Sequence, residues 1–187
     1  MVGAPFTLGV QQAEASASMK NRVGKTYTAK NFGLGTFKVK IRSKKNVELV
    51  SIKKPNKHST EVSFCSSDSC WFKGKKNDRD SRFQINSFGP YAFNKAKKIK
   101  RVYIYQWGKI VKMYPRAFAG SNVRKIDMST ATYKLKKKDV RNSLKGSKVK
   151  TLIVYAPKSS KNFKHMKKIF SAKNCGKKVK VKSLYSA

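Results

Sequence analysis

The chain has 187 residues, and its 45 Lys and Arg residues against 8 Asp and Glu residues give a formal net charge of +37. Hydrophobic residues make up 39% of the chain, which is enough for a core and excludes a wholly disordered protein. A charge this large on a small body is self-repelling, so we expect a permanent counter-charge such as nucleic acid or acidic protein surfaces. No apolar run reaches the length of a membrane span, and none is expected.

The kind of basic residue also carries information. Only 8 of the 45 are Arg, and the rest are Lys. Arg is the usual reader of base edges and of bidentate phosphate geometry, whereas Lys acts as a hydrated point charge. The composition therefore predicts diffuse electrostatic contact and not sequence-specific readout.

Residues 1–18 differ from everything that follows, since they contain Glu14 and no Lys or Arg. We expect an extended arm there, with a short helix over Val10–Ser18, that docks on a protein neighbour. A mobile terminus is the alternative. The start of the chain lacks the features of a signal peptide, which predicts an intracellular origin. From Met19 onward the basic residues are evenly spread, which predicts a single basic, β-rich domain over 19–187.

Hydrophobic residues in the first two thirds of this domain alternate mostly with period two, the pattern of half-buried strands. Turn residues at Ser43–Asn46 and at Gln106–Gly108 predict two hairpins. The sheet is therefore expected to be antiparallel and meandering. The predicted strands are 36–42, 47–52, 61–64, 71–72, 82–85, 101–105 and 109–114.

Helices are fewer. Phe93–Lys98 predicts a single turn, and Lys136–Leu144 predicts a short helix that stops before Gly146. Phe163–Ala172 has apolar residues at helical spacing, between expected strands at Thr151–Tyr155 and Lys178–Leu184. The fold class is thus a β-rich α+β fold with a C-terminal strand–helix–strand.

A short pattern occurs three times: a Lys-apolar-Lys triplet opens a strand, and the strand ends in Tyr eight residues along. The triplets begin at Lys98, Lys148 and Lys178, and the strands end at Tyr105, Tyr155 and Tyr185. We interpret these as three similar strands, because no period of 20–50 residues supports a solenoid.

The sequence contains no recognisable catalytic motif. His58 and His165 have no acid nearby in sequence, and Asp78 and Asp80 lie among lysines that would oppose a cation. Gly33-Leu34-Gly35 lacks the further glycine of a dinucleotide loop. We expect no enzyme activity, no catalytic residue, no cofactor and no metal.

Three cysteines, Cys65, Cys70 and Cys175, do not form a disulfide framework. Free thiols are the first interpretation. A hairpin disulfide between Cys65 and Cys70 is possible if the protein ends in an oxidising place. A zinc site would need all three cysteines and a histidine to converge.

Aromatic and basic residues interleave in one stretch, where rings could stack on bases while lysines meet phosphates. Packing of Tyr103 and Tyr105 on the core is the alternative interpretation. The candidate polyanion contacts are Lys98, Lys100, Arg101, Tyr103, Tyr105, Trp107, Lys109 and Lys112.

Lys-rich strands such as Thr36–Arg42 and Lys178–Lys182, together with the small-residue arm, give the chain the composition of a known class. It resembles minor capsid proteins of large icosahedral double-stranded DNA viruses, such as those of algae. The resemblance implies a cement protein that joins neighbouring subunits of a virus particle and faces polyanions, made in the host cell interior.

Its expected partners are other structural proteins of the particle, acidic protein surfaces, and DNA or RNA. The alternative function is a general nucleic-acid-binding protein of ribosomal or nucleoprotein type, in an intracellular ribonucleoprotein.

Overall fold

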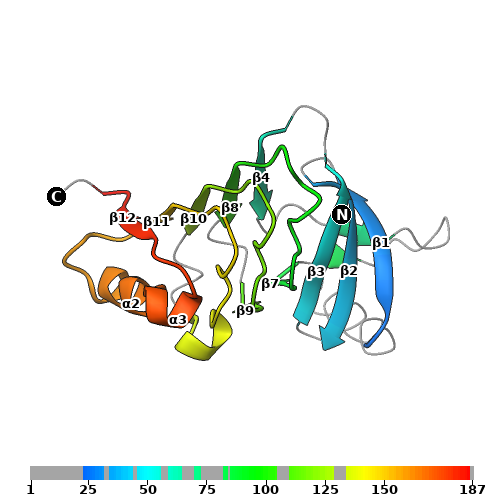
Figure 1. Ribbon diagram of the computed structural model, residues 1–187. Coiled ribbons are helices and arrows are strands. Elements are labelled where there is room, and N and C mark those ends of the chain that lie inside the picture. The colour runs from blue at the N-terminus through cyan, green and yellow to red at the C-terminus, as the bar shows by residue number, and fades with distance from the viewer. Residues whose placement is uncertain are drawn as a thin grey trace, which may run out of the picture.

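The computed structural model describes residues 23–31, 34–43, 46–55, 59–64, 70–72, 82–83, 85–104, 110–128 and 134–185. Two sheets dominate, and the helices lie at the end of the molecule opposite to the first strands (Figure 1). The prediction of a β-rich α+β fold is confirmed at this level. The predicted arm over 1–18 lies outside the described residues.

An antiparallel meander opens the fold. It consists of β1 (Thr26–Asn31), β2 (Gly35–Ser43) and β3 (Asn46–Lys54), which pair in that order. Alternation on β2 buries Phe37, Val39 and Ile41, as its period-two pattern predicts. The first predicted hairpin is therefore confirmed.

Two short strands extend the meander beyond β1. β5 (Cys70–Phe72) pairs antiparallel with β1, and β6 (Arg82–Phe83) pairs antiparallel with β5. On the other side the pairing changes direction. β3 pairs parallel with β7 (Ser87–Phe88), which pairs parallel with β9 (Lys112–Met113).

The second sheet is parallel throughout. Its order is β12-β11-β10-β8-β4, and each strand pairs only with its neighbours in that order. The bounds are β4 (Glu61–Phe64), β8 (Arg101–Ile104), β10 (Lys125–Met128), β11 (Thr151–Val154) and β12 (Lys180–Ser183).

The expectation of an antiparallel sheet is thus wrong for this half of the fold. The second predicted hairpin, between residues 101–105 and 109–114, is also wrong, because β8 and β9 lie in different sheets. Parallel neighbours need a crossover connection, and between β8 and β10 the chain forms β9 of the other sheet.

Successive coils of the chain stack on one another as a solenoid. Arg101, Lys125, Thr151 and Lys180 are aligned across β8, β10, β11 and β12, so the coils are 24, 26 and 29 residues long. Repeats of this length are typical of solenoids with one strand in each repeat. The expectation that no period supports a solenoid is therefore wrong.

A second set of hydrogen bonds links the coils away from this sheet. The amide of Tyr91 donates to Arg116 O (3.0 Å), that of Arg116 to Asn142 O (2.8 Å), and that of Asn142 to Asn174 O (2.8 Å). Tyr91, Arg116 and Asn142 all have positive φ, between 54° and 60°. The same left-handed corner thus recurs in three successive coils.

Equivalent apolar positions of the coils stack to form the core. Ile99, Val123 and Val149 occupy the position two residues before each strand, and all three are fully buried. Aromatic rings fill the first coils: the rings of Phe93 and Phe118 stack with centroids 4.7 Å apart, and the rings of Phe88 and Phe93 meet edge to face at 5.3 Å. The core is continuous along the solenoid because each coil buries its apolar side against the next.

The last coil contains the helices. α2 (Lys161–Ile169) begins at Ser160, whose hydroxyl accepts a hydrogen bond from the Phe163 amide (3.1 Å), and buries Phe163, Met166 and Ile169. α3 (Ala172–Cys175) ends at Gly176, which has φ of 80°. Together with β11 and β12 these helices confirm the predicted strand–helix–strand.

The short helix predicted at Lys136–Leu144 is a single 3₁₀ turn, η2 (Lys137–Asp139), followed by turns. None of the helices in the described part of the chain is long and apolar enough to cross a membrane.

Candidate polyanion interface

The acidic side chains in the described ranges all have partners within the protein. Glu48 pairs with Arg42, Glu61 accepts a hydrogen bond from Tyr103, and Asp127 pairs with Arg101. Asp139 accepts the backbone amide of Lys136 (2.8 Å). These four carboxylates therefore stabilise the fold and leave the surface lysines without neutralisation by them.

Arg101 lies at the centre of a polar cluster on the parallel sheet, together with Glu61, Tyr103 and Asp127. Its guanidinium donates twice to Oδ2 of Asp127, at 2.9 and 2.5 Å, and lies 4.5 Å from the ring centroid of Tyr103. Asp127 is 1% exposed, and its Oδ1 makes no hydrogen bond to any described residue. Because Arg101 compensates a buried carboxylate, we assign it a structural role.

The electrostatics of the cluster agree with that role. The hydrogen bond to Asp127 raises the pKa of Arg101, so this side chain stays charged. Burial and the hydrogen bond that Tyr103 donates to Glu61 (3.1 Å) raise the pKa of the Tyr103 phenol. The ring of Tyr103 is thus covered by a cation on one side and fixed at its hydroxyl.

Four strands of the parallel sheet, β8, β10, β11 and β12, begin with a similar local pattern, in which a buried or half-buried apolar residue precedes one or two more exposed residues. Val123 and Ile126 are buried, and Arg124 and Lys125 between them are exposed. The other coils repeat this with Ile99 and Val102 around Lys100 and Arg101, with Val149 and Leu152 around Lys150 and Thr151, and with half-buried Val179 and Val181 around Lys180.

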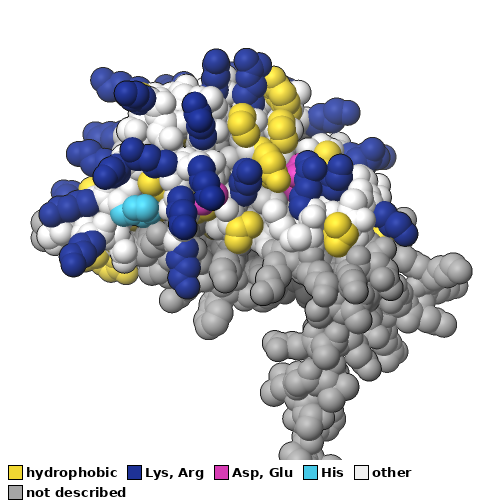
Figure 2. Space-filling model, turned by 90° about the horizontal axis from the view of Figure 1, so that it is seen from below, with side chains coloured by type: hydrophobic (Ala, Val, Ile, Leu, Met, Phe, Trp, Pro, Cys, Tyr) yellow, Lys and Arg dark blue, Asp and Glu magenta, His cyan; other side chains and the backbone are white. Residues whose placement is uncertain are grey.

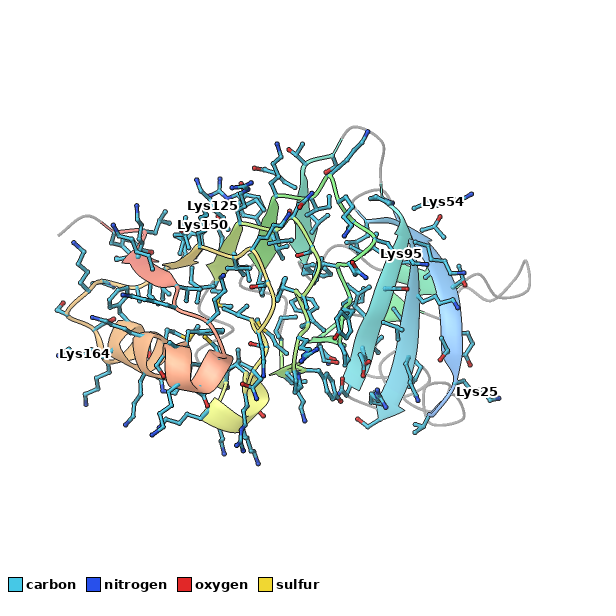
Figure 3. All side chains as sticks on the ribbon, in the orientation of Figure 1. Lys25, Lys54, Lys95, Lys125, Lys150 and Lys164 are labelled. Atoms are coloured by element: carbon cyan, nitrogen blue, oxygen red, sulfur yellow. The ribbon has the colours of Figure 1, made fainter. Side chains whose placement is uncertain are left out.

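The exposed positions fall in register at one edge of the sheet. The amide of Arg124 donates to Lys100 O (2.7 Å), that of Lys150 to Arg124 O (2.8 Å), and that of Lys180 to Lys150 O (2.9 Å). We define the strand-entry ridge as the five exposed basic residues at these corners: Lys100, Arg124, Lys125, Lys150 and Lys180. Lys125 and Lys150 lie together where β10 and β11 begin, far from Lys164 on α2 (Figure 3).

Only part of the predicted contact stretch reaches this ridge. Lys98 and Lys100 precede β8, and Arg101 and Tyr103 belong to the polar cluster. Lys112 lies on β9 in the other sheet, where its Nζ is 4.7 Å from the Tyr114 ring centroid. Tyr105, Trp107 and Lys109 lie outside the described residues.

The sequence analysis did not identify Arg124 and Lys125 as candidates, and it included Lys150 and Lys180 only as the last residues of two Lys-apolar-Lys triplets. The repeat of Lys98–Lys100, Lys148–Lys150 and Lys178–Lys180 was the signal that could have found them. The first two triplets precede β8 and β11, the third overlaps the start of β12, and the three strands belong to one sheet. β10 supplies the coil between them, with Asn122-Val123-Arg124 in place of the triplet.

The structure gives no candidate site at the predicted cysteines and histidines that it describes. Cys65 lies outside the described residues and Cys70 is the first residue of β5, so the proposed disulfide stays a prediction. Cys175 is a buried free thiol, and burial raises its pKa. His165 contacts Leu135 O through Nε2 (2.8 Å). No group of three His, Cys, Asp or Glu side chains within the described ranges could hold a metal ion.

Basic side chains are not confined to the ridge. Figure 2 shows Lys and Arg distributed over the face seen from below, with few acidic side chains among them. Comparison of the chain with protein-family models, with curated proteins and with solved structures finds no match.

Proposed function

We propose that this chain is a non-enzymatic, solenoid-shaped binding protein that engages polyanions and serves as a fixed part of a larger assembly. The observation that carries the proposal is the strand-entry ridge, where successive coils place exposed Lys or Arg side chains in register. The four acidic side chains in the described ranges are engaged by Arg, Tyr or backbone groups, and Asp127 is paired with Arg101. Uncompensated charges of one sign raise the local concentration of a polyanion and favour its association.

The repeat architecture supports this function. Solenoids present long, regular surfaces on which equivalent positions of successive repeats form one binding face. The acids of the described part of the chain are paired with Arg, Tyr or backbone groups, and this leaves them poorly placed for proton transfer.

A role as a virus cement protein, in the virion and with an N-terminal arm that docks on a neighbouring subunit, stays a prediction. It rests on composition, and the arm lies outside the described residues. The general nucleic-acid-binding function stays the alternative.

The test is binding of the purified protein to inorganic polyphosphate, duplex DNA and single-stranded RNA across a salt series, with neutral dextran as the control polymer. We expect all three polyanions to bind at 50 mM salt, with log K falling linearly with log salt because bound counterions are released. Binding of none of the three at low salt would overturn the proposal. Binding of one nucleic acid alone would favour the nucleic-acid alternative.

A further inference from the structure

The parallel stacking of coils aligns some of the basic side chains in a row. Neighbouring strands lie about 4.8 Å apart, so Lys100, Arg124 and Lys150 form a row that runs along the solenoid axis, with one cation per coil. Lys180 of β12 is in register with Thr151, one position further into the strand than Lys150, so it flanks the end of this row. A chain that lies across the strand entries meets Lys100, Arg124 and Lys150 in succession, whereas a chain that lies along β10 or β11 meets an exposed cation only where the strand begins.

The nearest described aromatic ring on the same strands is already engaged. Tyr103 carries the Arg101 guanidinium over its ring at 4.5 Å and donates its hydroxyl to Glu61. Nucleic-acid-binding proteins without sequence preference combine a charged groove with free rings on which bases stack. Here the cations of the ridge can contact phosphates, whereas the ring of Tyr103 is covered by Arg101 and cannot stack on a base from that side.

We infer that the strand-entry ridge is the binding site of a linear phosphate polymer, which lies along the solenoid axis and is recognised through its phosphates without base stacking. This inference rests on the proposed function and assigns its site and its ligand class. The four coils from β8 to β12 span about 15 Å at the usual strand spacing, which is enough for several successive phosphates.

The lysines next to the ridge help to define its edge. Lys148 Nζ donates to Asn122 Oδ1 (2.9 Å), and Asn122 Nδ2 donates to Lys97 O (2.8 Å). Lys97 Nζ in turn donates to Gly120 O (2.5 Å) and to Asn94 Oδ1 (3.1 Å). These side chains hold successive coils together, and the ridge cations have no acidic partner among the described residues.

Two triple variants of equal charge test the site. K100Q/R124Q/K150Q removes the row of the ridge. K161Q/K164Q/K168Q removes three exposed lysines from α2, on another part of the molecule. Both variants lower the net charge by the same amount, so a difference between them reports position and not total charge. Calorimetry with inorganic polyphosphate at 150 mM salt measures the affinity, and circular dichroism verifies the fold.

We expect the ridge variant to lose at least tenfold in affinity and the α2 variant less than threefold. The slope of log K against log salt should fall by about two for the ridge variant, at about 0.7 for each lost contact with a single strand. If the ridge variant fails to fold, the single pair Arg124→Gln and Lys164→Gln replaces the triples, with the same ordering expected.

Three outcomes would contradict the inference. Equal losses in the two triples would mean that binding is diffuse, which overturns the ridge while the proposed function stands. Absence of polyphosphate binding by the wild type, with RNA bound, would overturn the ligand class. Single-stranded RNA bound tenfold more tightly than polyphosphate per phosphate would show that bases are recognised, which overturns recognition through phosphates alone.

Discussion

Replacement of Arg101 by Gln tests whether this residue stabilises the fold, in contrast to the ridge residues, which we expect to bind the ligand. Asp127 is 1% exposed and depends on Arg101 for both hydrogen bonds to Oδ2, while its Oδ1 has no hydrogen-bond partner among the described residues. Breaking a buried ion pair on one side costs about 3–5 kcal/mol, because the remaining charge is left buried. The Arg101 side chain is 30% exposed, so solvent screening reduces the expected loss to about 2–3 kcal/mol.

Urea unfolding followed by circular dichroism measures this loss. With an m-value of about 2 kcal/mol/M, the midpoint should fall by about 1–1.5 M at an unchanged m-value. Lys125→Gln is the matched control, since it removes an exposed charge from the neighbouring strand, and it should change the free energy of unfolding by less than about 0.5 kcal/mol.

The double variant Arg101→Gln/Asp127→Asn completes the cycle. It should recover at least about 1 kcal/mol relative to the sum of the two single variants, because the pair is removed together. Equal stability of Arg101→Gln and Lys125→Gln would refute the assignment of Arg101 to Asp127. In polyphosphate binding the order should reverse, with Lys125→Gln weakening the affinity more than Arg101→Gln.

Three further changes test the coil stacking and the core. Phe93→Ala removes a fully buried ring that stacks on Phe118 and should cost about 4 kcal/mol in urea unfolding, against about 1 kcal/mol for Phe93→Leu. Gly120→Ala should cost more than Gly24→Ala: both have positive φ, but a Cβ at Gly120 would meet Asn94 Oδ1 at 2.6 Å, whereas Gly24 faces open space. Because burial raises the pKa of Cys175, its thiol stabilises the fold fully below the ordinary pKa of about 8.5 and progressively less as the pH rises beyond it. Unfolding midpoints at pH 7.5 and 9.5 should therefore fall less in Cys175→Ala than in the wild type.

The local elements were predictable where period-two alternation is strong, as on β2. The same holds for α2, where Phe163, Met166 and Ile169 share one buried face. β10 was missed because it is short and carries the charged Asp127 between its two apolar residues. Its burial depends on Arg101, a residue 26 positions earlier in the sequence.

The solenoid was not predicted because its repeat lies in geometry more than in residue identity. The coils differ in length, and the corner with positive φ is Tyr91 in one coil, Arg116 in the next and Asn142 in the third. The supposed hairpin at Gln106–Gly108 failed for a related reason. Two neighbouring alternating segments indicate strands, but the pattern alone does not state whether the strands share a sheet.

Only part of the candidate site could be predicted from the sequence. Lys100 was identified from the basic stretch before Tyr103. The row that it begins required Arg124 and Lys150 to be placed beside it by the parallel register. Charge composition predicted a polyanion partner in general terms. The parallel register then shows which basic residues of successive coils lie in one row.

Lysine footprinting shows where on the surface polyphosphate binds. Amine acetylation of the wild-type protein, with and without inorganic polyphosphate, followed by mass spectrometry, reports which lysines the ligand covers. If the ridge is the binding site, Lys100, Lys125, Lys150 and Lys180 are protected, and Lys161, Lys164 and Lys168 are modified at unchanged rates. Protection spread equally over both sets, or confined to α2, would contradict this prediction.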